Sequence, residues 1–173
     1  MRTSARSGFT LVEVMIVVAI IALLAAIAIP NVLRGRTSAN ESAAIGNLRA
    51  LASSLEMYRS VNMTFPDAWQ ADMYTNANPA FGPPNFNLGA FPILVQGYNY
   101  TYTQQAACLG TAVSPCNTFT VVAAPQTIGT TGTRTFFVNE SGTVRHCQSP
   151  PAGTAANGPN WTTIDQPPTN PCT

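Results

Sequence analysis

A run of apolar residues near the amino terminus constrains the fold more than any other feature. Residues 9–29 read FTLVEVMIVVAIIALLAAIAI and contain a single charged residue, Glu13. As an α-helix this run would be roughly 31 Å long, close to the thickness of the hydrocarbon core of a bilayer. Arg2 and Arg6 precede it and would hold that end on the cytoplasmic side. The sequence therefore predicts one membrane span followed by an extracytoplasmic domain.

The helical pattern continues beyond Pro30 but changes character. One apolar stripe is expected from residues spaced by four and three, namely Ala44, Leu48, Leu51, Leu55 and Tyr58, with Arg49, Glu56 and Arg59 largely off it. This pattern predicts one helix over residues 9–61, apolar on all sides over 9–30 and amphipathic over 31–61. Pro30 lacks a backbone donor and Gly35 has a low helix propensity, so the helix is expected to bend near them.

Strand patterns occur only in the second half of the chain. Residues 62–97 are rich in Asn, Pro and Gly and are expected to form an irregular loop. Strand patterns, either an alternation of aromatic and polar residues or a β-branched run, occur in three segments: 98–104, 118–125 and 134–147. They predict three or four antiparallel strands, the last two around the turn NESG. One face of this sheet could cover the apolar stripe, giving an α+β fold. Residues 98–173 would end in a proline-rich tail without regular structure.

The four cysteines indicate disulfide bonds. Cys108, Cys116, Cys147 and Cys172 form no C-x-x-C pair, and with a single histidine they make no convincing zinc site. An even count after a hydrophobic leader is typical of an oxidising, extracytoplasmic compartment. Three pairings are open. We favour Cys108–Cys116 and Cys147–Cys172, which would close turn-rich segments and stabilise the fold by roughly 2.5 and 3.5 kcal/mol.

Composition and motifs argue against several functions. Charged residues make up 9% of the chain and the net charge is +1, which argues against a nucleic-acid surface. His146 is best interpreted as structural, and Ser141 in NESG lies in a turn unlike a nucleophile elbow. The acids show no paired spacing for acid–base chemistry, and there is no phosphate-binding glycine loop. We therefore predict that the chain is not an enzyme and carries no cofactor or metal.

Three interpretations of the opening stretch compete. A secretory signal peptide could be cleaved at AIA, residues 26–28, although the apolar run is long and interrupted by Glu13. A plain signal anchor explains the length, and Glu13 would then only be an acid favoured by the helix dipole at the helix start. Such an anchor could carry a binding domain that never polymerises. The third interpretation rests on a family resemblance.

The sequence SGFTLVEVMIVVAIIALLAAIAIP closely resembles the leader and amino-terminal helix of type IV prepilins and of the related pseudopilins of type II secretion. The similarity lies in a short basic leader ending at Gly8, then Phe9, Glu13 four residues later, the apolar run and Pro30. It implies a leader at residues 1–8 and the family fold over the remainder. In that fold a long helix packs on a small antiparallel sheet, with an irregular αβ-loop over 62–97 and a disulfide-closed carboxy-terminal region.

The resemblance also implies a life cycle. Prepilin peptidase would cut between Gly8 and Phe9 and methylate the new amine of Phe9. Glu13 would meet the amine of a neighbouring subunit and set the register of a self-assembled filament, which an ATPase and a platform protein would help to build. The precursor would be stored in the inner membrane.

The resemblance does not by itself distinguish the types of subunit within this family. We expect the major pilin of an extracellular type IV pilus. A pseudopilin of a type II secretion system and a minor pilin are the alternatives.

Overall fold

The computed structural model describes residues 8–104, 118–148 and 161–167 of the 173-residue chain. The chain divides into two compact units, which we treat separately. The amino-terminal unit extends to Arg36, and the carboxy-terminal unit begins at Thr37.

A single long helix, α1, runs from Leu11 to Asn62 and contributes to both units. It begins two residues after the predicted start at Phe9. It ends where Met63 adopts a left-handed conformation with φ of 60°, while the Met63 N–H donates to the carbonyl of Arg59 over 2.8 Å. A left-handed residue directly after the last helical turn is a common way to end a helix.

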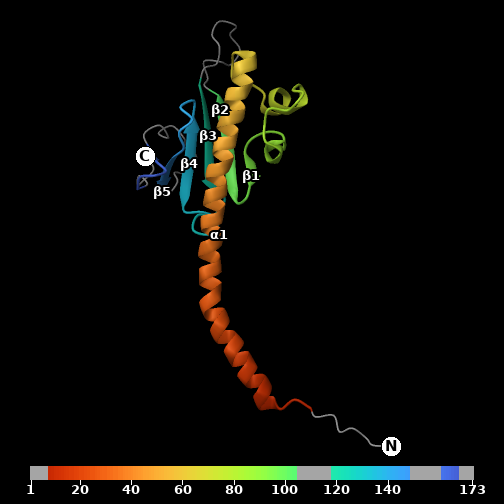
Figure 1. Ribbon diagram of the computed structural model, residues 1–173, viewed down its shortest axis with the longest axis vertical. Helices are drawn as coiled ribbons and strands as arrows, with labels where there is room; N and C mark the ends of the chain where they lie inside the picture. Colours follow the sequence, from red (N-terminus) through yellow and green to blue (C-terminus); the bar gives the residue numbers. More distant parts are fainter. Residues whose placement is uncertain (1–7, 105–117, 149–160, 168–173) are drawn as a thin grey trace, which may run out of the picture. The chain divides into compact units, whose positions relative to one another are not determined.

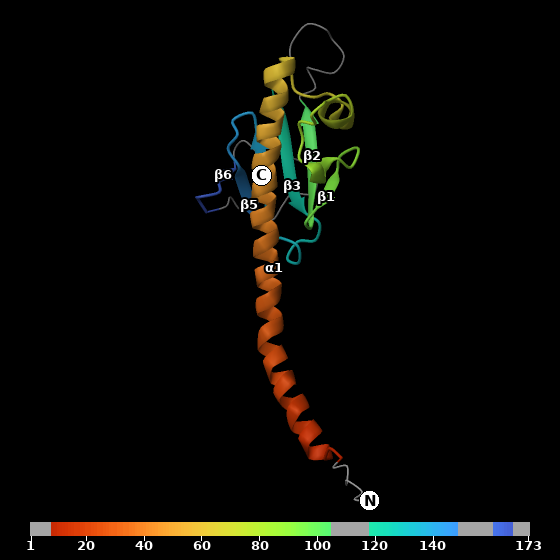
Figure 2. The ribbon, with the colours of Figure 1, turned by 45° about the vertical axis from the view of Figure 1, so that its right-hand side comes forward.

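The carboxy-terminal unit contains one antiparallel sheet, and the last part of α1 lies along it (Figures 1 and 2). The six strands follow one another in chain order as a meander. They are β1 (Ile93–Val95), β2 (Tyr98–Gln104), β3 (Phe119–Pro125), β4 (Arg134–Asn139), β5 (Arg145–Gln148) and β6 (Thr162–Thr163). A long helix against a small antiparallel sheet confirms the predicted α+β, pilin-like class.

The two outer strands differ from the prediction. β1 lies in the segment expected to be irregular and forms a hairpin with β2 through Gln96 and Gly97, whose φ angles are 50° and 78°. Two positive φ angles are what a tight two-residue hairpin turn requires. β6 lies in the proline-rich tail, which was expected to have no regular structure, and its two residues pair with Arg145 and His146. Three- and two-residue strands are too short for a readable alternation pattern.

The core confirms the apolar stripe of α1. Leu48, Leu51 and Leu55 are fully buried, as is Ala44, whereas Tyr58 packs at the edge of the cluster. Their partners on the sheet face the helix from three neighbouring strands: Tyr98, Tyr100, Phe119, Val121, Ala123, Phe136 and Val138. Burying large apolar side chains stabilises a fold by about 1.5–3 kcal/mol each, so this contact is the main attachment of helix to sheet.

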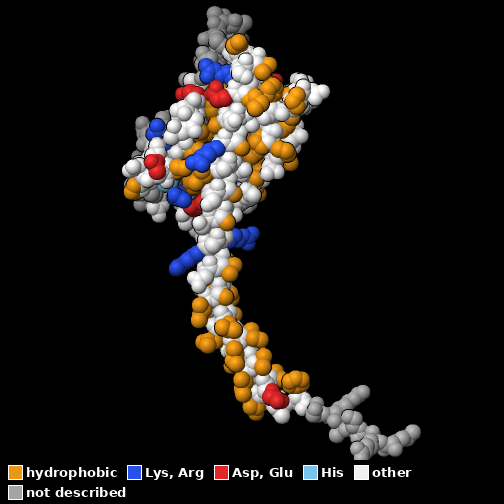
Figure 3. Space-filling view, viewed as in Figure 1, with side chains coloured by type: hydrophobic (Ala, Val, Ile, Leu, Met, Phe, Trp, Pro, Cys, Tyr) orange, Lys and Arg blue, Asp and Glu red, His pale blue; other side chains and the backbone are white. Residues whose placement is uncertain are grey.

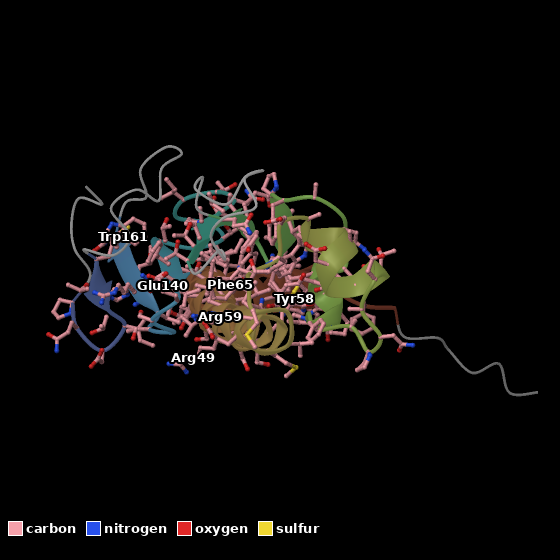
Figure 4. All side chains as sticks on the ribbon, turned by 90° about the horizontal axis from the view of Figure 1, so that it is seen from above. Arg49, Tyr58, Arg59, Phe65, Glu140 and Trp161 are labelled. Carbon is pink, nitrogen blue, oxygen red and sulfur yellow. The ribbon has the colours of Figure 1, made fainter. Side chains whose placement is uncertain are left out.

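The segment between α1 and β1 is irregular but well packed. It contains a single π-helical turn, η1 (Ala71–Thr75), and a 3₁₀ turn, η2 (Pro84–Phe86). Trp69 is buried and its indole N–H donates to the carbonyl of Phe86 over 3.1 Å. The guanidinium carbon of Arg59 lies 5.3 Å from the ring centre of Phe65 (Figure 4). Side chains of this loop are therefore part of the hydrophobic core.

A second, smaller cluster joins Phe137, Cys147 and Trp161 (Figure 4 labels Trp161). Phe137 and Trp161 meet edge to face with 6.0 Å between ring centres. Cys147 is disulfide-bonded. Its predicted partner Cys172 lies outside the described residues, as does the predicted pair Cys108–Cys116, so the favoured pairing stays a prediction.

Glu41 forms a partly buried ion pair that ties α1 to β4. Its Oε2 accepts hydrogen bonds from Nε of Arg134 at 2.9 Å and lies 2.7 Å from Nη2, a two-pronged contact. Its Oε1 accepts from the N–H and the hydroxyl of Thr133, each at 2.8 Å. Burial alone would raise the pKa of Glu41, but these bonds from Thr133 and Arg134 outweigh it and hold the pKa below its ordinary value.

The network extends through Arg134 to His146. Nη1 of Arg134 lies 3.0 Å from Nδ1 of His146, and Nε2 of His146 lies 3.0 Å from the carbonyl of Gln166. Because arginine can only donate, Nδ1 must accept, so the imidazole is neutral and its Nε2–H donates to Gln166. Burial, together with the nearby Arg134 charge, lowers the pKa of His146. The histidine is structural, as its position predicts.

The ion pair gives a first prediction, which uses one substitution at two sites. Glu41→Gln keeps the side-chain shape but leaves Arg134 without its counter-charge, and we expect it to lower the free energy of unfolding by roughly 3 kcal/mol. Glu56→Gln is the matched control, because Glu56 forms an exposed pair with Arg59 at 3.7 Å and should cost less than about 1 kcal/mol. Urea unfolding of the full chain in detergent, followed by tryptophan fluorescence, measures both. Equal effects of the two variants would contradict a dominant role for Glu41.

The neutral histidine gives a second prediction. A folded-state pKa below the unfolded value means that the unfolded chain binds more protons, so stability is complete above about pH 6.5 and falls as the pH drops below it. His146 is the only histidine. The variant His146→Gln can accept from Arg134 and donate to Gln166 without titrating. We expect this variant to show a flatter dependence of unfolding free energy on pH between 6.5 and 5. An unchanged slope would show that other groups carry the effect.

Candidate functional site

The surface of α1 between Leu11 and Leu33 is largely apolar (Figure 3). Its large side chains project from all sides of α1 and remain more than half exposed: Leu11, Val12, Val14, Met15, Ile16, Val17, Val18, Ile20, Ile21, Leu23, Leu24, Ile27, Ile29, Val32 and Leu33. Among the described residues, α1 is the one helix long and apolar enough to cross a membrane. A helix that is apolar all round needs either lipid or other helices around it.

Thr10 and Glu13 form a capping box at the start of α1. The backbone N–H and the hydroxyl of Thr10 both donate to Oε2 of Glu13 at 2.8 Å, and the Glu13 N–H donates back to the Thr10 hydroxyl at 3.2 Å. Threonine followed three residues later by glutamate satisfies backbone donors that a helix start otherwise leaves unpaired. Glu13 therefore has a local structural role, as the helix-start interpretation required.

The capping box uses only part of the Glu13 carboxylate. Among the described residues, no hydrogen bond reaches Oε1 of Glu13. A carboxylate offers about four lone-pair positions on its two oxygens. The arrangement thus leaves an acceptor oxygen on an exposed side chain beside the helix start, within an apolar surface.

Gly8 and Phe9 precede the helix and are accessible. Nothing lies within 4 Å of the position that a Cβ of Gly8 would occupy, and the side chain of Phe9 is 89% exposed. The peptide bond between them is the predicted cleavage site. Gly8, Phe9 and Glu13 lie near one another because they are close in the sequence, and tertiary packing plays no part in this.

Pro30 and Gly35 both lie inside α1, which continues through them without a break. Pro30 cannot donate to the carbonyl one turn earlier. In the same turn, the side-chain amide of Asn31 donates to the carbonyl of Ile27 over 3.2 Å. No heavy atom lies near the missing Cβ of Gly35. A bend at these two residues stays a prediction.

We did not identify Thr10 and Glu41 from the sequence, although the sequence contains a signal for each of them. The pattern T-x-x-E directly before an apolar run is a recognised helix-start motif, and it identifies Thr10 as the partner of Glu13. Glu41 lies three residues before Ala44, in register with the apolar stripe. An acid on a stripe that becomes buried requires a cationic partner. The identity of that partner, Arg134, could not be read from spacing along the chain.

Two shallow openings lie in the carboxy-terminal unit among the described residues. One, of about 290 Å³, is lined by Thr103, Gln104, Thr118, Phe119, Thr120, Asn139 and Glu140. Another, of about 220 Å³, lies between α1 and the sheet near Arg49, Glu56, Phe119 and Asn139. Among the described residues, no three His, Cys, Asp or Glu side chains cluster as metal ligands would. The candidate site that we consider further is the start of α1, which carries Gly8, Phe9 and Glu13.

Comparisons with known proteins agree with this location. A family profile described as the prokaryotic N-terminal methylation motif matches residues 3–29. The chain is 39% identical over 108 residues to type II secretion system core protein G of Pseudomonas aeruginosa, covering 59% of this chain and 76% of that protein. The protein of the same name from Vibrio cholerae is 35% identical over 89 residues, covering 50% of this chain and 60% of that protein.

Other relatives match over a shorter stretch. Core protein G of Escherichia coli is 36% identical over 64 residues, which cover 37% of this chain and 44% of that protein. No solved structure gives a significant match. The chain has the methylation motif and a long apolar helix, and it covers 76% of a relative to which it is 39% identical. This chain therefore belongs to the family of type IV pilins and pseudopilins.

Proposed function

We propose that this protein is a pseudopilin, a structural subunit of the short periplasmic filament of a type II secretion system. The observation that carries the proposal is the similarity to core protein G of several bacteria, 39% identical in Pseudomonas aeruginosa. This favours the pseudopilin alternative over the extracellular major pilin that the sequence alone led us to expect. The role is structural and not enzymatic.

The apolar helix and the methylation motif fit a precursor anchored in the inner membrane. Prepilin peptidase would cut between the accessible Gly8 and Phe9 and methylate the amine of Phe9. The capping box survives this cut, because the N–H of Thr10 lies in the peptide bond after Phe9. Cleavage therefore adds a cationic amine next to a preformed helix start.

Assembly would use the oxygen that the capping box leaves free. Oε1 of Glu13 can accept a hydrogen bond from the Phe9 amine of a neighbouring subunit while Oε2 remains bound to Thr10. A charge in an apolar bundle is costly unless it is paired, so subunits gain most at the register where acid meets amine. One polar contact in an apolar seam is an effective way to select a register.

Burial of the exposed apolar surface would stabilise the filament core. Leaving lipid for a helix bundle gains less than leaving water, since lipid is itself apolar. Extraction from the membrane must therefore be driven, which agrees with the expected use of an ATPase and a platform protein. Pro30 and Gly35 are the positions at which α1 could bend during packing.

A third prediction separates the two roles of Glu13. Glutamine is accepted at this position of a capping box, so Glu13→Gln should preserve α1 yet remove the charge that pairs with the amine. We expect filament assembly and secretion to be lost while the protein still accumulates in the membrane, with unchanged helix content by circular dichroism. Normal assembly of Glu13→Gln would show that Glu13 serves only to start the helix.

A fourth prediction tests the assignment itself. Deleting the gene in its own bacterium should abolish release of type II substrates into the medium and leave surface pili visible by electron microscopy. Mass spectrometry of the mature protein should show an amino-terminal N-methylphenylalanine at Phe9. Loss of surface pili with normal secretion would instead support the type IV pilin, and a terminus at Ile29 would support a secretory signal peptide.

A further inference from the structure

The carboxyl end of the apolar segment of α1 carries two arginines with no assigned role. Arg34 and Arg36 are exposed and belong to the amino-terminal unit. Neither takes part in an ion pair within the described residues. The chain has no Asp or Glu between Glu13 and Glu41, and Glu41 is held by Arg134 and Thr133. The pair is thus a local concentration of positive charge without a counter-charge.

The position of the pair along α1 matches the far edge of a bilayer. At 1.5 Å per residue, the helix rises about 31 Å between Glu13 and Arg34, close to the roughly 30 Å of a hydrocarbon core. When the capping box lies at one interface, Arg34 and Arg36 lie at the other. In Figure 3 the apolar stretch of α1 gives way to basic side chains.

The angle between the two arginines indicates what kind of partner they meet. Residues two apart on an α-helix point about 200° apart, so Arg34 and Arg36 project from opposite sides of α1. A protein partner docking on one face would engage one of them. A layer of phosphate groups surrounds the helix at the interface and can engage both.

Membrane topology does not explain the pair. Positive residues near the end of a span favour the cytoplasmic side for that end. A pair on the extracytoplasmic side therefore opposes the orientation that Arg2 and Arg6 favour. Removal of the leader would take Arg2 and Arg6 away and leave Arg34 and Arg36 in place. Their positive charge therefore needs an explanation other than orientation.

We propose that Arg34 and Arg36 bind anionic phospholipid headgroups of the outer leaflet of the inner membrane and hold the stored subunit at a defined depth. The inference rests on the proposed storage of the precursor in that membrane. Each basic residue near an anionic membrane surface raises the affinity for that surface roughly fivefold. Extraction of a subunit would have to break these contacts, so the pair adds to the work of assembly.

The test places a fluorescent probe next to the pair. The full chain with Val32→Trp is reconstituted into phosphatidylcholine vesicles containing phosphatidylglycerol, with either lipid brominated along its acyl chains to quench nearby tryptophan. Val32 is 67% exposed on the same part of α1. The native residues Trp69 and Trp161 are buried and give the background in the chain without the probe.

We expect brominated phosphatidylglycerol to quench the probe several-fold more than its share of the lipid predicts. Arg34→Gln with Arg36→Gln should abolish this enrichment, and raised salt should weaken it. Arg34→Lys with Arg36→Lys should retain it, because the charge matters and not the guanidinium shape. Arg49→Gln with Arg59→Gln removes the same charge further along α1 and should leave this enrichment unchanged.

Two results would overturn the inference in different ways. Equal quenching by the two brominated lipids, or enrichment that persists in the Arg34→Gln, Arg36→Gln variant, would exclude headgroup binding while leaving membrane storage intact. No quenching by either lipid would show that this part of α1 is not in the bilayer, and would contradict the proposed storage as well.

Discussion

The contact between one stripe of α1 and the sheet supports the rest of the carboxy-terminal unit, and Glu41 adds directional polar contacts to it. Leu48, Leu51 and Leu55 supply apolar burial, but apolar packing has little directionality. The two-pronged contact of Glu41 with Arg134 and its two bonds from Thr133 do have direction. They also connect α1 to β4 and, through His146, to the carbonyl of Gln166 near β6.

The helix itself serves two environments. In the amino-terminal unit its side chains are exposed on all sides and suit lipid or neighbouring helices, whereas in the carboxy-terminal unit one stripe is covered by the sheet. Polar residues mark both ends of the apolar segment. Thr10 and Glu13 satisfy the backbone at its start, and Arg34 and Arg36 provide charge near its end. The proposed storage in a membrane and the proposed packing in a filament would place different demands on these same residues.

Glu13 shows how a local structural role and a proposed functional role coexist. Its Oε2 is occupied by Thr10, which preserves the first turn of α1. Its Oε1 accepts no hydrogen bond within the described residues, and its proposed partner is the amine of another subunit. A glutamine can perform the first role and not the second, and this difference makes the proposal open to experiment.

Periodicity along the sequence was enough to predict α1, its apolar stripe, β2 and the α+β class, because helix and strand repeats depend on near neighbours. The motif at the amino terminus was enough to predict the family. Short strands such as β1 and β6 could not be predicted, since two or three residues carry no period. The pairing of Glu41 with Arg134 was decided only by the tertiary structure, because residues 93 positions apart meet only after helix and sheet have packed.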